Sequence, residues 1–330
     1  MAEEERLIMA MGGNVARVKI VTDSTAYLTP ELVSKYDVQV VPLIVAFGKD
    51  SYVEGVDIAD EEFYRKLKSH ESSPKTSEPP VEQFLKVYGE VADTASQVLS
   101  IHLSGKLSAT VESARAAAKQ LHDRQIEVVD SSFTAMALGM VVIAAGKAAD
   151  EGQSLPDIKR ATEDVIKNTH FLFVVDTLKY LRDAGRLGAV TALFDAVLSP
   201  KPVFGFKDGR IEQMAGARTK PKAAQRMLEL MEKHVSPGAP VHVSVIHAHA
   251  FDEAVELERQ VRARFNCREL YFSEVGPVIG ANVGPGMAGL ALYCECGATG
   301  TPIAQRQTNT LAVPNQGQVS QGSLASRSRN

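Results

Sequence analysis

The chain has 330 residues, of which 45% are hydrophobic and 23% charged, and its net charge is −4. These values are typical of a globular protein with one large domain or two ordinary ones, and they give no overall attraction to nucleic acid or to an anionic membrane. Three cysteines are too few for a disulfide framework, and the first residues lack the basic and apolar segments of a signal peptide. We therefore expect a cytoplasmic protein.

Short β-branched segments alternate with helical periods in the first half of the chain. Strands are predicted at residues 18–22, 38–46, 97–103 and 126–130. Helices are predicted from Thr29-Pro30-Glu31 onward and at residues 60–67, 81–95, 108–121 and 134–151. The last helix is nearly uncharged over residues 135–146, about half the length of a membrane span, so we expect it to be buried. Strict alternation of strand and helix predicts a mainly parallel sheet.

The second half mixes such units with a hairpin. A helix with capping-box spacing is predicted from Ser154 to about Lys167, and an Asp-Gly turn signal predicts a hairpin at Lys207-Asp208-Gly209. Further strands are expected at residues 171–175, 241–246, 269–273 and 287–293, and helices up to residue 196 and at 221–234 and 251–264. These elements predict a mixed sheet in the second half of the chain.

This pattern predicts an α/β fold of two lobes. We expect a flexible extension at residues 1–16, an N-terminal α/β lobe at 17–160 and a C-terminal α/β lobe at 161–293. Residues 294–330 contain no aromatic residue and one acid, and Gln, Ser, Thr, Gly and Asn fill 20 of the 37 positions. Such a segment buries too little apolar surface to offset its ordering entropy, so the tail is predicted to be disordered.

Three motif candidates do not meet their structural requirements, and a fourth allows two interpretations. Gly105-Lys106-Leu107-Ser108 lacks the earlier glycine of a phosphate loop, and the Gly-Pro-Gly-Met-Ala-Gly segment at 284–289 has no downstream strand to complete a dinucleotide site. Cys294-x-Cys296 has no partner ligands at zinc spacing. The histidines at 242, 247 and 249 allow either a metal site or ordinary hydrogen bonds at a strand end, and we favour the hydrogen bonds. No cofactor or metal is expected.

Hydroxyl-rich loops follow the predicted strands of the first half. They are Asp23-Ser24-Thr25, Thr76-Ser77-Glu78-Pro79, Ser104 to Ser108, and Asp130-Ser131-Ser132. Each could simply cap a helix, but four on one sheet edge form a polar site suited to a carboxylate or phosphate. Because no general base or nucleophile pair is evident, binding is better supported than catalysis.

Five segments of the sequence resemble the DegV family of bacterial fatty-acid-binding proteins. They are Val18–Ser24, Lys75–Pro79, Leu103–Thr110, Val174–Arg186 and Glu274–Gly289, in the family's order. The resemblance implies two α/β lobes that hold one long-chain fatty acid between them in an apolar tunnel. It also implies that the protein is not an enzyme, and that it presents the carboxyl group to an ATP-dependent fatty acid kinase that makes acyl phosphate for phospholipid synthesis.

The resemblance also implies roles for single residues. Thr76, Ser108, Ser104 and Asn282 match positions expected to bind the carboxylate, and Arg186 and Arg218 match basic positions associated with kinase docking. Asn282 stands where relatives usually have histidine. Since asparagine cannot become cationic, we expect a head-group site with weak charge dependence.

Two alternatives to the carrier hypothesis remain. One is a small-molecule kinase or phosphatase that acts through the Ser104–Ser108 loop. The other is a regulatory binding module whose tail, residues 294–330, recruits partners. A co-purifying fatty acid, or turnover of ATP or a phosphate ester, distinguishes the carrier from the enzyme.

Overall fold

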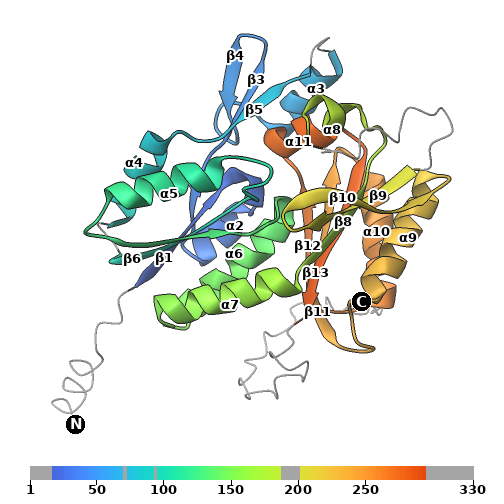
Figure 1. Cartoon of the computed structure of the whole chain (residues 1–330). Helices are drawn as coiled ribbons and strands as arrows, with labels where there is room; N and C mark the ends of the chain where they lie inside the picture. The colour runs from blue at the N-terminus through green and yellow to red at the C-terminus, as the bar shows by residue number, and fades with distance from the viewer. Residues whose placement is uncertain (1–16, 70–72, 93–94, 187–200, 295–330) are drawn as a thin grey trace, which may run out of the picture. The chain divides into compact units, whose positions relative to one another are not determined.

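The structure is a computed structural model of the chain, and it describes residues 17–69, 73–92, 95–186 and 201–294 (Figure 1). The predicted extension of residues 1–16 lies outside the described residues. So do residues 295–330 of the predicted tail and residues 187–196 of the predicted helical stretch. The predicted boundary near residue 160 stays a prediction.

A parallel sheet of four strands is built from the first half of the chain, as the strand–helix alternation predicts. Its order is β2-β1-β6-β7, and all neighbouring pairs are parallel. Helices α4 and α5 contact its strands from one side. The elements are β1 (Val18–Asp23), α2 (Pro30–Lys35), β2 (Gln39–Val41), α4 (Val81–Ala92), β6 (Gln97–His102), α5 (Thr110–Gln120) and β7 (Gln125–Asp130).

The single strand predicted at residues 38–46 is two strands that belong to different sheets. Pro42 lies between them and has no N–H to donate to a ladder, so the parallel strand ends at Val41. The chain continues as β3 in an antiparallel sheet of order β4-β3-β5. This sheet and the helix after β4 comprise β3 (Ile44–Phe47), β4 (Asp50–Val53), α3 (Asp60–Ser69) and β5 (Lys75–Ser77).

The second half forms the predicted mixed sheet, of order β10-β9-β8-β13-β11-β12. Its pairs are antiparallel except β11 with β12, and β9 and β10 form the hairpin predicted at Asp208-Gly209. The elements are β8 (His170–Val174), α8 (Lys179–Asp183), β9 (Lys201–Lys207), β10 (Arg210–Ala217), α9 (Lys220–Glu232), β11 (Pro240–Ala248), α10 (Phe251–Arg264), β12 (Asn266–Glu274), α11 (Pro277–Val283) and β13 (Met287–Cys294).

Helices α6 (Ala135–Asp150) and α7 (Leu155–Asn168) lie between the parallel sheet and the mixed sheet (Figure 1). Helix α6 contacts β1 on one side and β11 and β13 on the other, and α7 contacts β6 and β13. The largest hydrophobic core surrounds them. Two further cores fill the spaces between the parallel sheet and α4 and α5, and between the mixed sheet and α9 and α10. The burial predicted for residues 135–146 is thereby confirmed.

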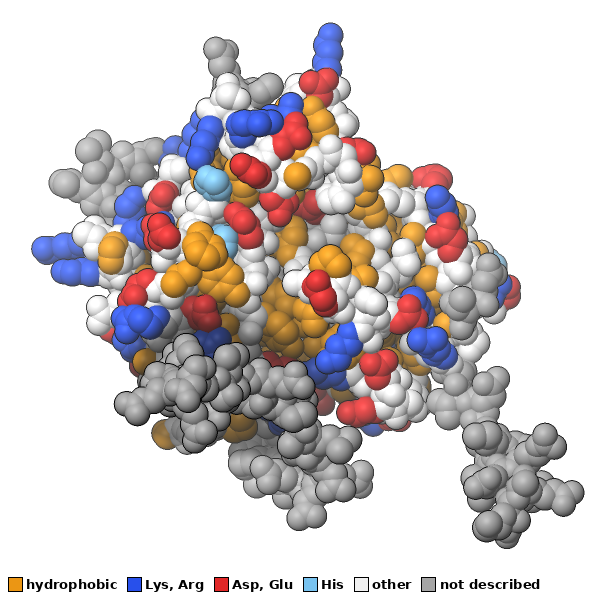
Figure 2. Space-filling model, turned by 180° about the vertical axis from the view of Figure 1, so that it is seen from behind, with side chains coloured by type: hydrophobic (Ala, Val, Ile, Leu, Met, Phe, Trp, Pro, Cys, Tyr) orange, Lys and Arg blue, Asp and Glu red, His pale blue; other side chains and the backbone are white. Residues whose placement is uncertain are grey.

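The surface carries charges of both signs. On the face shown in Figure 2, acidic and basic side chains of the described residues are interspersed, with hydrophobic side chains gathered between them. This agrees with the small net charge of −4. Within the described ranges, no helix is both long enough and apolar enough to cross a membrane.

Candidate functional site

A cavity lies where the loops of the parallel sheet meet the mixed sheet. The first half of the chain contributes residues from β5, from the loops that follow β6 and β7, and from the start of α6; the second half contributes residues from β8, β9, β10, α11 and β13. The space measures about 700 Å³, counted with its open mouth.

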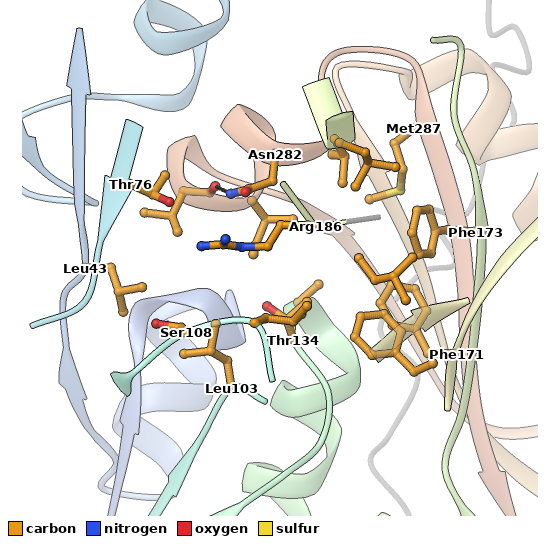
Figure 3. Close-up of a pocket in the computed structure, with 18 of the residues that line it drawn as sticks. Leu43, Thr76, Leu103, Ser108, Thr134, Phe171, Phe173, Arg186, Asn282 and Met287 are labelled. Atoms are coloured by element: carbon orange, nitrogen blue, oxygen red, sulfur yellow. Dashed lines mark hydrogen bonds between the residues drawn. The ribbon is translucent and has the colours of Figure 1, made fainter. Parts of the chain in front are cut away.

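One end of the cavity is polar. Thr76, Ser108, Asn282 and Arg186 come from four separate segments of the chain, and Figure 3 shows them on the same side of the space. Three are neutral hydrogen-bonding groups and one is a permanent cation. This set suits a single carboxylate.

Existing hydrogen bonds limit what two of these groups can offer to a ligand. Ser108 Oγ lies 2.9 Å from Thr110 Oγ1 and accepts the Thr110 amide proton at 3.3 Å. Asn282 Nδ2 donates to Val278 O in its own helix at 2.6 Å. Its second amide proton and its Oδ1 are then left for a ligand, so Asn282 can offer one donor.

The other end of the cavity is apolar. Phe171 and Phe173 are two residues apart on β8 and therefore share one face of the strand, and Figure 3 shows both at the cavity wall. Phe206 of β9 stacks on Phe171, with ring centroids 5.1 Å apart, and Met287 of β13 completes this wall. Leu172 lies between the two phenylalanines in sequence and belongs to a different core, as the strand period requires.

Buried hydrogen bonds from the first half of the chain fix helix α11, which carries Asn282. Glu54 Oε1 accepts the Val278 amide proton at 2.7 Å, and Tyr27 Oη accepts that of Ile279 at 3.1 Å. Ser24 Oγ in turn donates to Glu54 Oε2 at 2.5 Å. Glu54 is 4% exposed, and this burial raises its pKa to about 7. The sequence does not single out Glu54, and it predicts no helix at the position of α11.

Ser104 and Arg218 lie away from the cavity lining. Ser104 is buried, donates its hydroxyl proton to Gly209 O at 2.7 Å and accepts the Lys106 amide proton at 3.2 Å. It thereby ties the β9–β10 hairpin to the loop after β6. Arg218 is exposed between β10 and α9. Arg186, for which the sequence predicted docking, lines the cavity itself.

Asp23, His102 and Ser100 form a buried chain with the order of a hydrolase triad. His102 Nδ1 lies 3.0 Å from Asp23 Oδ2, and His102 Nε2 lies 2.7 Å from Ser100 Oγ. All three side chains are fully buried, so no substrate reaches the Ser100 hydroxyl. Asp23 Oδ2 also accepts the amide proton of Leu103, a cavity residue, at 2.9 Å. These hydrogen-bonded side chains therefore fix the carboxyl ends of β1 and β6 beside the cavity.

The remaining sequence motifs have structural roles. His242 Nδ1 lies 2.8 Å from Glu269 Oε2, and His247 Nδ1 lies 3.8 Å from Glu274 Oε1. Among residues 17–69, 73–92, 95–186 and 201–294, no group of three or more His, Cys, Asp or Glu residues is placed to hold a metal ion. The glycines at 284 and 286 have φ of 70° and 86° in the turn from α11 to β13, which explains this Gly-Pro-Gly segment without a nucleotide.

Comparisons with known proteins agree on one family. A family model described as "Uncharacterised protein, DegV family" matches residues 17–295. A DegV domain-containing protein of Halalkalibacterium halodurans is 37% identical over 282 residues, which cover 85% of this chain and 100% of that protein.

Solved structures show the same similarity. A DegV family protein from Thermus thermophilus, described as binding fatty acid, has a TM-score of 0.79 and 33% identity, with 84% of this chain and 99% of that chain covered. DegV of Bacillus subtilis, described as a fatty acid binding protein, has a TM-score of 0.78 and 32% identity, with the same coverage.

Proposed function

Because the chain belongs to the DegV family, we propose that it binds one long-chain fatty acid in this cavity. It is a carrier that presents the carboxyl group to an ATP-dependent fatty acid kinase in the cytoplasm, and it does not itself catalyse the transfer. The acyl phosphate made by the kinase then serves phospholipid synthesis. The descriptions of the Thermus thermophilus and Bacillus subtilis proteins as binding fatty acid support the ligand class.

The observation that carries the proposal is the division of the cavity into a polar and an apolar end. An acyl chain gains about 0.8 kcal/mol for each methylene that it buries, whereas a hydrogen bond contributes about 1 kcal/mol net. The aromatic wall of Phe171, Phe173 and Phe206 therefore supplies affinity. The polar groups fix the direction in which the ligand lies.

The carboxylate is assigned to Thr76, Ser108 and Asn282, with the Arg186 guanidinium nearby. Ser104 belongs with them by sequence, but its hydroxyl proton is already donated to Gly209 O. We assign Ser104 to holding the hairpin that forms part of the cavity wall. Arg218 is exposed, and we assign it to an acidic surface of the kinase. Arg186 lines the cavity, and we assign it to both the head group and the partner.

The test is extraction of the purified protein with organic solvent, followed by mass spectrometry of the extract. A long-chain fatty acid in near-stoichiometric amount is expected. After delipidation, titration with hexadecanoic acid should show one site, and a Phe173→Ala variant should bind more weakly because the aromatic wall is shortened. The exposed Phe251, 63% accessible on α10, gives the matched control Phe251→Ala, which should bind normally.

An extract without fatty acid, together with turnover of ATP or a phosphate ester by the protein alone, would refute the carrier and favour an enzyme that uses the Ser104–Ser108 loop. Presentation is tested separately by adding the kinase and ATP and measuring acyl phosphate. If the kinase makes no acyl phosphate from protein loaded with fatty acid, the carrier role is refuted and only the binding of fatty acid remains.

A further inference from the structure

Helix α6 begins without the contact that its first residues favour. Thr134 is the N-cap residue and has an extended backbone with φ −153° and ψ −176°, yet its side chain accepts no backbone N–H. A threonine at this position normally accepts the amide proton of a residue two or three positions later. The first turn of α6 also contains no acidic side chain. The Thr134 hydroxyl is therefore not satisfied within the helix.

The Thr134 hydroxyl is buried and faces the cavity. Thr134 is 4% exposed, and its Oγ1 has no hydrogen-bond partner in the described part of the chain. It lines the cavity, and Figure 3 shows its oxygen between Ser108, at the polar end, and the phenylalanine wall. Ser108 differs, since its hydroxyl is already 2.9 Å from Thr110 Oγ1. Buried hydroxyls without a partner are uncommon and costly, so this one indicates a group that arrives with the ligand.

The position of Thr134 determines what that group is. A ligand whose carboxylate lies at Thr76 and Ser108 and whose tail lies against Phe171 passes Thr134 with the first carbons of its chain. A plain methylene there covers the hydroxyl and leaves it without a partner. A hydroxyl on one of these carbons can donate to Thr134 Oγ1 or accept from it.

We propose that Thr134 is a specificity-determining residue that binds a hydroxyl close to the carboxyl group, so that the preferred ligand is a 2- or 3-hydroxy long-chain acid. This inference rests on the proposed fatty-acid site and names the ligand class within it. A site that hydrogen-bonds a ligand hydroxyl discriminates against the analogue that lacks it, because the buried protein group is then left unpaired.

The experiment measures affinities of delipidated protein for four ligands: hexadecanoic acid, its 2-hydroxy and 3-hydroxy derivatives, and 16-hydroxyhexadecanoic acid as the control with a distant hydroxyl. Wild-type protein should bind the 2- or the 3-hydroxy acid about tenfold more tightly than hexadecanoic acid, a ratio worth about 1.4 kcal/mol. The 16-hydroxy acid should show no such gain. Equal affinities for hexadecanoic acid and both head-proximal hydroxy acids would refute the inference, and this result needs no variant.

Variants then assign the preference to one atom. Thr134→Val keeps the shape and removes the hydroxyl, so it should abolish the preference, while Thr134→Ser should keep it. The matched control is Thr22→Val on β1, since Thr22 is also buried and its Oγ1 also lacks a partner within the described ranges, but it does not line the cavity. This control should bind all four ligands like wild type.

The outcomes separate the two proposals. A wild-type protein that binds none of the acids refutes the proposed function and this inference with it. A protein that binds all of them, and in which Thr134→Val weakens every acid equally, refutes only the inference and makes Thr134 another carboxylate contact.

Discussion

Glu54 gives the sharpest quantitative prediction because it is a carboxylic acid buried between the two halves of the chain. Its oxygens accept hydrogen bonds from Ser24 Oγ, Tyr27 Oη and the Val278 amide. Burial outweighs these three donors and raises its pKa from the usual 4.5 to about 7. The perturbation is Glu54→Gln, which keeps the size of the side chain and removes its titration.

The magnitude follows from the difference between the folded and unfolded pKa. Between pH 4.5 and about pH 7 the folded protein holds a proton on Glu54 that the unfolded chain has lost, so the free energy of unfolding falls as the pH rises. Protonated Glu54 contributes fully to the free energy of unfolding below pH 4.5, and this contribution is lost as the pH rises through 7. Each pKa unit corresponds to about 1.4 kcal/mol, so the total loss is about 3 kcal/mol.

One neighbouring acid acts in the same direction. Burial raises the pKa of Asp60, and the charge of Glu274 raises it further. Asp60 remains in the variant, so the comparison between wild type and Glu54→Gln isolates Glu54. Relative to wild type, the free energy of unfolding of the glutamine variant should therefore increase by about 3 kcal/mol as the pH rises from 4.5 to 8.

Urea denaturation of delipidated protein at pH 4.5, 5.5, 6.5 and 7.5 measures this difference. The control is Glu90→Gln, at a glutamate whose side chain is 60% exposed in α4, which should follow wild type at every pH. If wild type and Glu54→Gln lose stability in parallel over this range, Glu54 is ionised with an ordinary pKa and the reasoning about its burial is wrong.

Three further predictions concern the cavity. Thr76→Ala and Ser108→Ala should each lower affinity for hexadecanoic acid about fivefold and lower acyl phosphate formation by the kinase more; unchanged phosphorylation would contradict their role in orienting the carboxylate. Ser104→Ala should lower the free energy of unfolding in urea by about 1–3 kcal/mol, because Gly209 O loses its buried donor, with little change in affinity; a large loss of affinity would return Ser104 to the carboxylate site. Asn282→His should make affinity rise as the pH falls through about 6.5, so constant affinity from pH 5 to 8 would place residue 282 away from the carboxylate.

The sequence predicts the local elements well where a local signal determines them. The helix expected at residues 134–151 is α6 (Ala135–Asp150), whose apolar residues are buried from both sides. The Asp-Gly turn gives the β9–β10 hairpin, and Ser154 caps α7 by accepting the Asp157 amide proton at 3.4 Å. The parallel sheet follows from the alternation of strands and helices. Each of these features depends on residues that are close together in the chain.

Features that depend on residues distant in the chain could not be predicted in this way. Helix α11 has almost every residue buried, contains Gly280 and has no polar face, so its sequence shows no helical period. Strand β5 is three polar residues, Lys75–Ser77, and becomes a strand only by pairing with β3. Neither element can be predicted from local patterning, although α11 and β5 carry Asn282 and Thr76.

The two serines of one loop show why the site residues could be predicted only in part. Ser104 and Ser108 both carry hydroxyl groups in the loop after β6, and the sequence alone gives no reason to assign them different roles. Ser104 donates to Gly209 O, 105 positions away, whereas Ser108 lines the cavity. The distinction depends on where the second half of the chain places its hairpin.

The same dependence explains how the cavity holds its shape. Its wall from the second half is fixed to the first half at two places by buried hydrogen bonds, Ser104 to Gly209 at the hairpin and Glu54 to Val278 at α11. Breaking a buried hydrogen bond costs about 1–3 kcal/mol, so neither the hairpin nor α11 moves without this penalty. The hairpin, and α11 with Asn282, are therefore held in place against the first half of the chain. If the cavity binds a carboxylate as proposed, three neutral groups with one arginine orient it without a cluster of positive charge.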